Sequence, residues 1–516
     1  MTTLPTPATA PAASGRVQRA VLSWGVGMAA QVIIAGIGFF ATPLLLRWLG
    51  SQRFGSWMAL SEWMGYLALF QLAVSGPILV LLLRARGAGD RSALSGLVHK
   101  GLWLYVAVVL VTLPAGFWLV WRVPAVIPIA ARYASQLRWA AAISLVPWLT
   151  VPLQIYRCVL EVEQRSYWNR FSLFLQSLVV TGLSLWLVWN GWGLLGLAVA
   201  SAIGLTLGHV LTAYWGRASL PPRSASKPAT LSRREFWRLG WPVTLAGLGN
   251  RLNLMTDNIV VAALLGPAAV AVFYVTQRLM LFLGRMVNDL SNISWAGLSE
   301  MRAGGAPHAF SDRVVELSAT VLGLGFVLLG SIAAFNRDFV SLWVGSSNYG
   351  GDALTWVTAA GAIVFAYLCF FASLLDTQGD ARRRLPVSSM GSALNLLLSL
   401  ALAWKFGLVG VALGTLVAYL ASDVWNTPRL VSRLYGVSGV SLIRAALRAT
   451  FWGLLWGGGV AWLVSRLPPS RHWLQLALNL SWVLACGAIY AWTLILSRRD
   501  RALWRERWGA WRQRSL

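Results

Sequence analysis

Residues 170–215 read RFSLFLQSLVVTGLSLWLVWNGWGLLGLAVASAIGLTLGHVLTAYW, and they contain the pattern on which the whole chain is built. Two apolar runs, 170–189 and 194–215, are separated only by Asn190–Gly193. Each run has about the 20 residues that an α-helix needs to cross roughly 30 Å of hydrocarbon. Because the connection is so short, the two helices must be antiparallel neighbours. The stretch therefore predicts a pair of membrane-spanning helices.

Similar apolar runs recur along all 516 residues of the chain, of which 57% are hydrophobic and only 12% are charged. A water-soluble fold cannot bury so many runs of this length. The first run, 21–46, is far longer than the apolar core of a signal peptide, so we count it as the first spanning helix. We predict an all-α integral membrane protein with about fourteen helices, at 21–46, 54–83, 101–121, 137–157, 170–189, 194–215, 239–265, 268–298, 314–334, 353–375, 387–404, 406–426, 445–465 and 473–496.

Composition divides the chain into segments. The longest connection is rich in Pro, Ser and basic residues, which is typical of a linker. We predict a disordered cytoplasmic tail (1–19), an N-lobe of six helices (20–216), a cytoplasmic linker (217–238), a C-lobe of six helices (239–426), two further helices (427–497) and a basic cytoplasmic tail (498–516).

The two predicted lobes have related sequences. Leu49-Gly50 is echoed by Leu265-Gly266 at an offset of 216 residues. The hairpin Trp192-Gly193-Leu194-Leu195-Gly196-Leu197-Ala198 is echoed by Phe406-Gly407-Leu408-Val409-Gly410-Val411-Ala412 at an offset of 214. Two independent matches at nearly one offset predict a pair of pseudo-symmetric lobes. Since both lobes begin and end on one side of the membrane, the repeat is parallel, about an axis along the membrane normal.

The net charge of +26 suggests nucleic acid at first, but the basic residues lie in short clusters between apolar runs. With both termini in the cytoplasm, 31 of the 43 Lys and Arg residues fall inside, nine fall outside and three fall within spans. Basic loops remain on the cytoplasmic side of a membrane. This bias predicts an orientation with both termini inside and argues against binding of nucleic acid.

The residue types that usually carry catalysis or bind metals show no useful spacing. The three cysteines have no CxxC pattern and the four histidines are scattered, so we predict no metal site, no disulfide framework and no catalytic residues. Two isolated ionisable residues are predicted to have structural roles. His209 is predicted to be a packing histidine, and Asp423 is predicted to be an interfacial charge at the cytoplasmic end of its helix.

Two stretches resemble a known family. The first is Ala41-Thr42-Pro43-Leu44-Leu45-Leu46-Arg47-Trp48-Leu49-Gly50, followed by Phe54-Gly55-Ser56-Trp57 and Gly65-Tyr66-Leu67; the second contains Asp257-Asn258-Ile259-Val260, Leu265-Gly266, Phe273-Tyr274-Val275 and Arg278. They resemble polysaccharide (O-antigen type) flippases of the multidrug, oligosaccharidyl-lipid and polysaccharide exporter superfamily. The resemblance covers residues 16–426, and helices 13 and 14 are an expected C-terminal extension.

This resemblance implies a V-shaped pair of lobes around a central cavity and an alternating-access mechanism. It implies export of a sugar repeat unit linked to undecaprenyl pyrophosphate across a bacterial inner membrane. We predict no bound cofactor, and a proton or a sodium gradient could drive the export. A complex with glycan assembly enzymes is possible. Members of the family often carry an acidic residue before a glycine in helix 2. This chain has Gln71-Leu72-Ala73 there, which puts any coupling role of that acid in doubt.

Ionisable residues inside predicted spans are the candidate site residues, because a charge at the membrane centre costs about 2.5–3.5 kcal/mol on insertion scales. Guanidinium groups bind phosphate oxygens in a bidentate manner. We therefore predict a cationic substrate-binding site formed by Arg47, Arg53, Arg251, Arg278 and Arg285. Coupling or gating roles are predicted for Glu62, Asp257 and Asp289.

Simpler roles for these residues remain open. Arg285 and Asp289 are four residues apart on one helix and could neutralise one another, as could Arg251 and Asp257. The 216-residue offset places Glu62 and Arg278 at matching depth, where they could form a gate.

Three other functions also remain open. A lipid II flippase would carry the same headgroup. A cation-coupled multidrug exporter would share the fold, although it usually has twelve spans and embedded acids. A membrane-embedded glycan polymerase or glycosyltransferase generally needs a sizeable external loop or a nucleotide-sugar domain, for which the sequence gives no sign, so we predict that the chain is not an enzyme.

Overall fold

The computed structural model of the chain describes residues 13–220, 238, 256–305, 307–377, 380–496, 501–502 and 505. All regular secondary structure in these ranges is helical, which confirms the predicted all-α fold. Eleven helical stretches within them are long and apolar enough to cross a membrane, judged by length and composition. The chain is a multi-pass membrane protein.

The difference between eleven stretches and fourteen predicted spans has identifiable causes. The predicted span 239–265 lies mostly outside the described residues. Helix α13 (Ala381–Ala418) turns back at Gly407, so that one long stretch contains two predicted spans. Helix α15 (Gly439–Arg466) has the length of a span, but it is rich in Trp and Gly, which contribute little to hydropathy.

The chain divides into two compact units, residues 1–247 and 248–516. Most of the predicted linker, residues 221–237, lies outside the described residues, so the predicted segment boundaries remain predictions.

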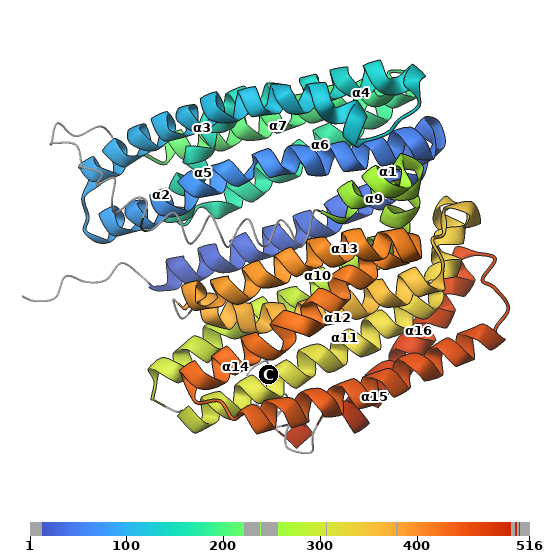
Figure 1. Cartoon of the computed structure of the whole chain (residues 1–516). Coiled ribbons are helices and arrows are strands. Elements are labelled where there is room, and N and C mark those ends of the chain that lie inside the picture. Colours follow the sequence, from blue (N-terminus) through green and yellow to red (C-terminus); the bar gives the residue numbers. More distant parts are fainter. Residues whose placement is uncertain are drawn as a thin grey trace, which may run out of the picture. The chain divides into compact units, whose positions relative to one another are not determined.

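The helices of the first unit, the N-lobe, are blue to green in Figure 1. They are α1 (Ala13–Leu67), α2 (Leu69–Gly87), α3 (Arg91–Val126), α4 (Ala131–Ile143), the 3-10 helix η1 (Val146–Gln154), α5 (Ile155–Val162), α6 (Ser166–Trp189) and α7 (Gly193–Ala218). Helix α1 begins at Ala13, and the bounds of the predicted cytoplasmic tail remain a prediction.

Two predicted N-lobe spans are interrupted. The span 54–83 is broken by a turn at Ala68, between α1 and α2. The span 137–157 contains η1, in which Pro147 and Pro152 lack the backbone N–H that a regular α-helix requires. Hydrophobicity alone gave no sign of either interruption.

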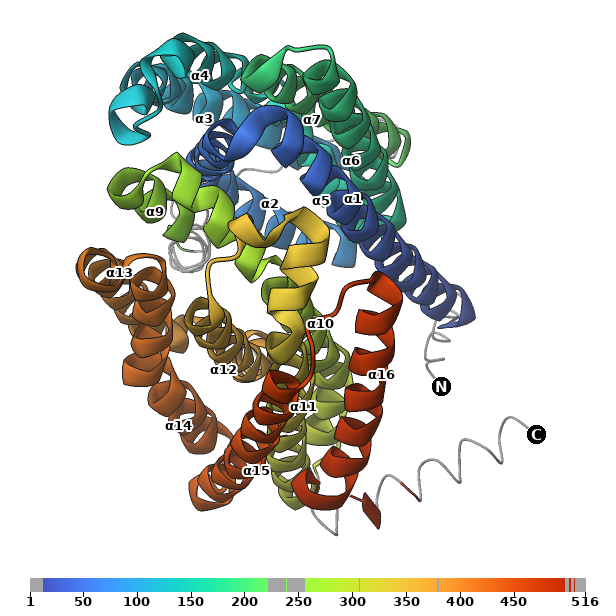
Figure 2. The same cartoon turned by 90° about the vertical axis from the view of Figure 1, so that its right-hand side faces the viewer.

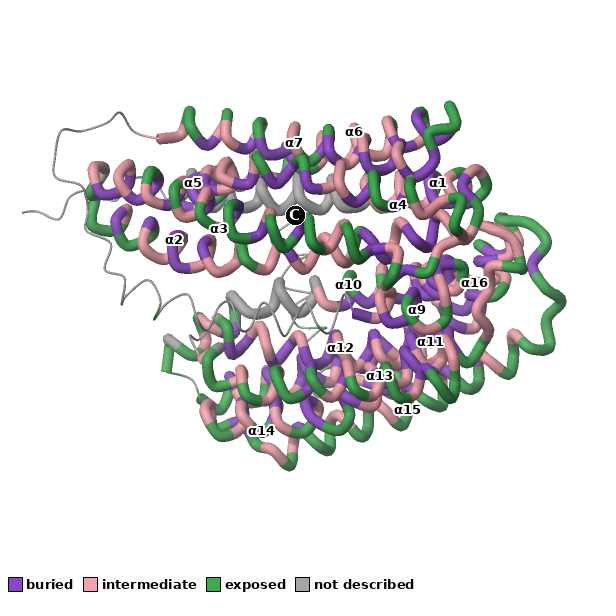
Figure 3. The backbone as a smooth tube through the Cα atoms, turned by 45° about the horizontal axis from the view of Figure 1, so that its top comes forward, coloured by how far each residue is buried: buried purple, intermediate pink, exposed green. Residues whose placement is uncertain are grey.

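The second unit contains the C-lobe and the last two helices. Its helices are α9 (Asp257–Leu265), α10 (Pro267–Ala303), α11 (Pro307–Val344), η2 (Ser346–Asn348), α12 (Asp352–Thr377), α13, the π-helix η3 (Tyr419–Asp423), α14 (Val424–Tyr435), α15, α16 (Trp473–Tyr490) and the π-helix η4 (Ala491–Ile495). Helix α11 packs against α10, α12, α15 and α16 and is largely buried (Figures 2 and 3).

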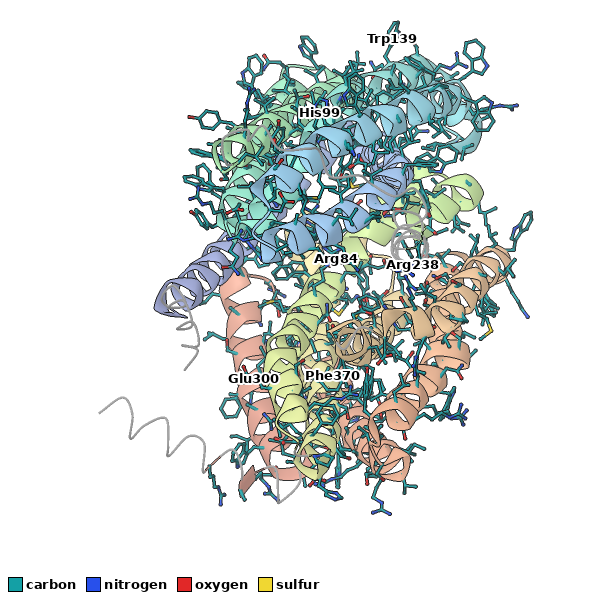
Figure 4. All side chains as sticks on the ribbon, turned by 90° about the vertical axis from the view of Figure 1, so that its left-hand side faces the viewer. Arg84, His99, Trp139, Arg238, Glu300 and Phe370 are labelled. Carbon is teal, nitrogen blue, oxygen red and sulfur yellow. The ribbon has the colours of Figure 1, made fainter. Side chains whose placement is uncertain are left out.

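Aromatic residues mark the inside and the outside of these helices. Phe370 of α12 is fully surrounded within the second unit, whereas Trp139 of α4 projects away from the N-lobe (Figure 4). Five Trp residues near the ends of helical stretches are exposed: Trp121, Trp189, Trp192, Trp404 and Trp473. Their exposure is what an interfacial anchor requires.

Backbone conformation confirms the predicted repeat. Gly50 (φ 76°, ψ 161°) and Gly266 (φ 89°, ψ 162°) end their helices in the same unusual conformation. The hairpin glycines Gly193 (φ 55°) and Gly407 (φ 57°) also match. The conserved geometry lies at the positions that the 216- and 214-residue offsets relate. Each lobe therefore uses glycine to make the same two breaks.

The conformation of Gly50 and Gly266 is open almost only to glycine, and it costs other residues about 1–3 kcal/mol. We expect Gly50→Ala and Gly266→Ala each to lower the free energy of unfolding of the detergent-solubilised protein by about 1–3 kcal/mol, measured as a lower melting temperature. Gly361→Ala, in a regular helix with open space around its Cα, is the matched control and should have little effect. Equal stability of all three variants would contradict the claim that alanine is strained in the backbone conformation of Gly50 and Gly266.

Candidate functional site

Helix α10 carries two arginines on one face. Arg278 and Arg285 are seven residues apart, which is two helical turns. At 1.5 Å per residue, Arg278 lies about 17 Å and Arg285 about 27 Å from the start of α10 at Pro267. Compared with a hydrocarbon core of about 30 Å, Arg278 is at middle depth and Arg285 is close to the far boundary.

These arginines are not neutralised by the described part of the chain. Arg278 is half-buried, with its guanidinium 5.2 Å from the centre of the Tyr274 ring, and Arg285 is exposed. No carboxylate among the described residues lies within salt-bridge distance of either guanidinium. Other arginines are paired, as in Arg384–Asp376 at 3.4 Å. A cation at middle depth that has no carboxylate partner among the described side chains is suited to binding an anion.

Two of the predicted partners cannot be placed. Arg251 and the side chain of Asp289 lie outside the described residues, so neither the Arg251–Asp257 pair nor the Arg285–Asp289 pair is tested. Glu62 is half-buried on α1 in the N-lobe, and Arg278 belongs to the other unit. Their proposed gate remains a prediction.

Arg53 has a structural task that the sequence did not suggest. Its Nε donates to the Leu49 carbonyl at 2.7 Å and its Nη2 to the Trp48 carbonyl at 3.2 Å. The guanidinium also lies 5.0 Å from the centre of the Tyr133 ring. These contacts close the helix end at the Gly50 break, where carbonyls lack intrahelical donors. Arg47 is exposed near the same break, and a binding role for either residue remains a prediction.

Asp257 lies in a cluster of oxygen atoms built by α9 and both halves of α13. The Thr415 hydroxyl is 3.3 Å from Asp257 Oδ2 and 3.0 Å from Asn395 Oδ1. The Ser399 hydroxyl is 3.0 Å from the same Asn395 oxygen and 3.2 Å from the Val411 carbonyl oxygen. Two hydroxyl hydrogens therefore face four oxygens, counting both of the carboxylate. A bound cation or an added proton would balance this excess of acceptors.

The cluster is not a general product of the repeat. The positions in the N-lobe that the same offsets relate to it are Ala41, Thr181, Leu185 and Ser201, which lack a carboxylate. Only the C-lobe therefore carries the acid. Asp257 was predicted from sequence, but Asn395, Ser399 and Thr415 were missed. The available signal was the spacing of Asn395 and Ser399, which are four residues apart within one apolar span, whereas Thr415 in the next span gave no such signal.

The predictions for His209 and Asp423 have opposite outcomes. The Nδ1 atom of His209 is 2.7 Å from the Thr150 hydroxyl in a buried setting, which confirms the predicted packing histidine. Asp423 was predicted to be an interfacial charge, and this is wrong, because its side chain is only 8% exposed. The helix continues for twelve residues through α14, so Asp423 lies inside the packed region.

Comparisons with known proteins give a family and a fold. A family model described as "Polysaccharide biosynthesis protein" matches residues 21–292, slightly more than half of the chain. No curated protein matches the sequence.

Several solved structures share the fold. The lipid II flippase MurJ in an inward closed conformation has a TM-score of 0.64 at 13% identity, covering 91% of this chain and 99% of its own. An inward-facing multidrug resistance MATE family transporter of the MOP superfamily has a TM-score of 0.54 at 14% identity, covering 79% and 96%. A MOP superfamily transporter from Pyrococcus furiosus has a TM-score of 0.53 at 15% identity, covering 81% and 96%. At these identities the likeness establishes the fold.

Proposed function

The chain belongs to the polysaccharide biosynthesis protein family, and from that premise we propose that it flips a lipid-linked sugar repeat unit across the membrane. The cargo is a glycan on undecaprenyl pyrophosphate, and the membrane is the inner membrane of a bacterium. The protein works by alternating access and catalyses no covalent step. This proposal is supported by the family and by a fold shared with transporters and a flippase.

The observation that carries the proposal is the pair of arginines on one face of α10, for which the described side chains supply no carboxylate within salt-bridge distance. A pyrophosphate bears several negative charges, and each guanidinium offers it a planar fork of donors. Arg278 and Arg285 lower the cost of moving this headgroup through the hydrocarbon by replacing part of its hydration. The same face disfavours cationic drugs, since like charges in a setting of low dielectric repel strongly.

The Asp257 cluster supplies the coupling site in this proposal. Carboxylate, hydroxyl, amide and backbone carbonyl oxygens are the ligands that hard cations prefer, and carbonyls and helix ends coordinate sodium or protons in other transporters. Sodium or a proton binds at Asp257. A cation that binds one conformation more tightly than the other shifts the balance between them. Movement of the cation down its gradient then resets the carrier.

We also propose that both termini lie in the cytoplasm, on the basis of the 31-to-nine charge bias. Alkaline phosphatase fused after residue 346 should then be active, and fused after residue 225 inactive. The reverse pattern would contradict this orientation.

Binding of the headgroup tests the proposed cargo. We expect the purified protein in nanodiscs to bind undecaprenyl pyrophosphate and to bind undecaprenol, which lacks both phosphates, at least about tenfold more weakly, the equivalent of one charge-assisted hydrogen bond. Tryptophan fluorescence can follow this, since the chain has 30 Trp residues. Equal affinity for the two lipids would mean that no cationic site binds the pyrophosphate headgroup.

A further inference from the structure

We propose that a file of buried polar side chains along α13 and η3 forms a second cation site at Asp423 and connects it to the Asp257 cluster. The occupant is a monovalent cation, sodium or a proton, that enters or leaves at the end of the file where α14 begins. The inference rests on the proposed coupling role of Asp257, but it concerns a different carboxylate and a route.

The first wall of the file is one face of the first half of α13. Ser388, Ser392, Asn395 and Ser399 follow one another at spacings of four, three and four residues, which places them on one side of a helix. Ser392, Asn395 and Ser399 are each only 1% exposed, whereas Leu397 on another side is 64% exposed. The polar face is therefore turned into the protein, where its groups hydrogen-bond one another and the backbone, as Ser392 does with the Ser388 carbonyl at 2.7 Å.

The second wall comes from the second half of α13 and from η3. It carries Thr415, Tyr419, Ser422 and Asp423, and the last three are buried. The walls meet closely at Gly391, where a Cβ atom would lie 2.8 Å from the Ser422 hydroxyl oxygen and closer still to Asp423 Oδ2. Only glycine allows Asp423 to face the first wall at this point.

The π-helix turns two consecutive residues toward the file. Residues 419–423 form η3, and single π-turns within α-helices often mark functional sites. The Ser422 hydroxyl is 2.7 Å from both Asp423 Oδ2 and the Ala418 carbonyl oxygen, and Asn426 Nδ2 donates to the Ser422 carbonyl at 2.8 Å. These oxygens surround the carboxylate with further possible ligands. As at Asp257, one hydroxyl hydrogen faces more than one acceptor.

The charges are arranged for stepwise movement. Thr415, at the Asp257 cluster, precedes Asp423 by eight residues, or about 12 Å along a helix. Tyr419 lies between them in the sequence and is buried. Arg384, at the start of α13, is paired with Asp376 at 3.4 Å. The two carboxylates thus lie along one buried polar stretch, with an arginine on the same helix that already has an acidic partner.

The described N-lobe residues at the matching positions do not form a comparable file. The position that the 214-residue offset relates to Asp423 is His209, which is held by Thr150. The neighbouring Gly208 is in contact with the Gln176 side chain. This lobe fills the same place with a satisfied histidine and a bulky amide, so the C-lobe file is specific to the lobe that contains Asp257.

Cysteine accessibility tests the route. In full-length protein whose native Cys158, Cys369 and Cys486 are replaced by Ala, we expect Ser392→Cys and Ser422→Cys to react with a charged methanethiosulfonate reagent added from the cytoplasmic side. Two controls should remain unreactive: Ser331→Cys, a serine with 0% exposure on α11 outside the file, and Leu397→Cys, on the apolar outer face. Lack of reaction at both 392 and 422 in folded protein would overturn the file.

A substitution of Asp423 in the otherwise wild-type protein tests the cation site itself. We expect Asp423→Asn to slow cation-driven transport in proteoliposomes at least about tenfold, a change equivalent to one lost charged contact, while equilibrium cation binding at the Asp257 cluster is retained. Transport at the wild-type rate would overturn a cation site at Asp423. If the wild-type protein binds neither sodium nor a proton, the proposed coupling role of Asp257 fails. The cysteine experiment still tests the file in that case, because the reaction of the cysteines does not depend on Asp257.

Discussion

Replacing Arg278 and Arg285 together by Gln should lower the rate of lipid-linked glycan transport at least about 100-fold, with Arg278→Gln alone causing most of the loss. A hydrogen bond between charged groups contributes about 1.5–3 kcal/mol, and each 1.4 kcal/mol is a factor of ten. Arg278 should matter more because it lies at middle depth and is half-buried, where water competes less. Arg278→Lys should recover part of the rate, since it keeps the charge and loses the planar fork.

The matched control is Arg302→Gln on the same helix. Its guanidinium lies 4.1 Å from the centre of the Tyr435 ring, as that of Arg278 lies against Tyr274. This variant therefore loses a charge and a similar cation–π contact near the end of α10, but not at middle depth. Transport is measured in proteoliposomes with equal amounts of inserted protein. Unchanged transport by the double variant, or an equal loss in the control, would contradict an anion-binding role for this face.

Asp257→Asn should abolish gradient-driven transport, leaving less than about 1% of the wild-type rate, because Asp257 supplies the one carboxylate among the described residues of the oxygen cluster. The asparagine has nearly the same shape and can still contact Thr415, so the fold should persist. Thr415→Val should have a smaller effect of about tenfold, since it removes one neutral ligand worth roughly 0.5–1.5 kcal/mol.

Asp352→Asn is the control for this experiment. Asp352, the first residue of α12, accepts a hydrogen bond of 2.6 Å from the Tyr349 hydroxyl, so it tests the loss of an acid in a structural contact. The measurement compares transport with and without an imposed sodium or proton gradient. An Asp257→Asn protein that still responds fully to the gradient would remove this cluster from the coupling mechanism.

Much of the fold followed from the sequence for simple physical reasons. Apolar length sets the spans, and short polar connections with glycine set the hairpins. The offsets between Leu49-Gly50 and Leu265-Gly266, and between the hairpins at Gly193 and Gly407, predicted breaks that the backbone angles match. Glycine can be read in this way because its left-handed conformations have few substitutes.

The site was less accessible to sequence reasoning. Asp257 and Arg278 were identified because charge within an apolar run is costly wherever it lies. Asn395, Ser399 and Thr415 are neutral, and their importance depends on the rotation of three helices that brings them to one carboxylate. Arg53 is the reverse case. Its charge drew attention, but its contacts with Trp48 and Leu49 carbonyls depend on a helix break one turn away.

The most direct test of the central claim is flipping by the purified wild-type protein in liposomes. A fluorescent sugar repeat unit on undecaprenyl pyrophosphate is placed in both leaflets, and its exposure to an external quencher is followed after a sodium or proton gradient is imposed. We predict gradient-dependent flipping of this lipid, with lipid II moved more slowly and a cationic dye not moved. Flipping of lipid II in preference, or export of the dye without movement of the lipid-linked glycan, would contradict the proposed function.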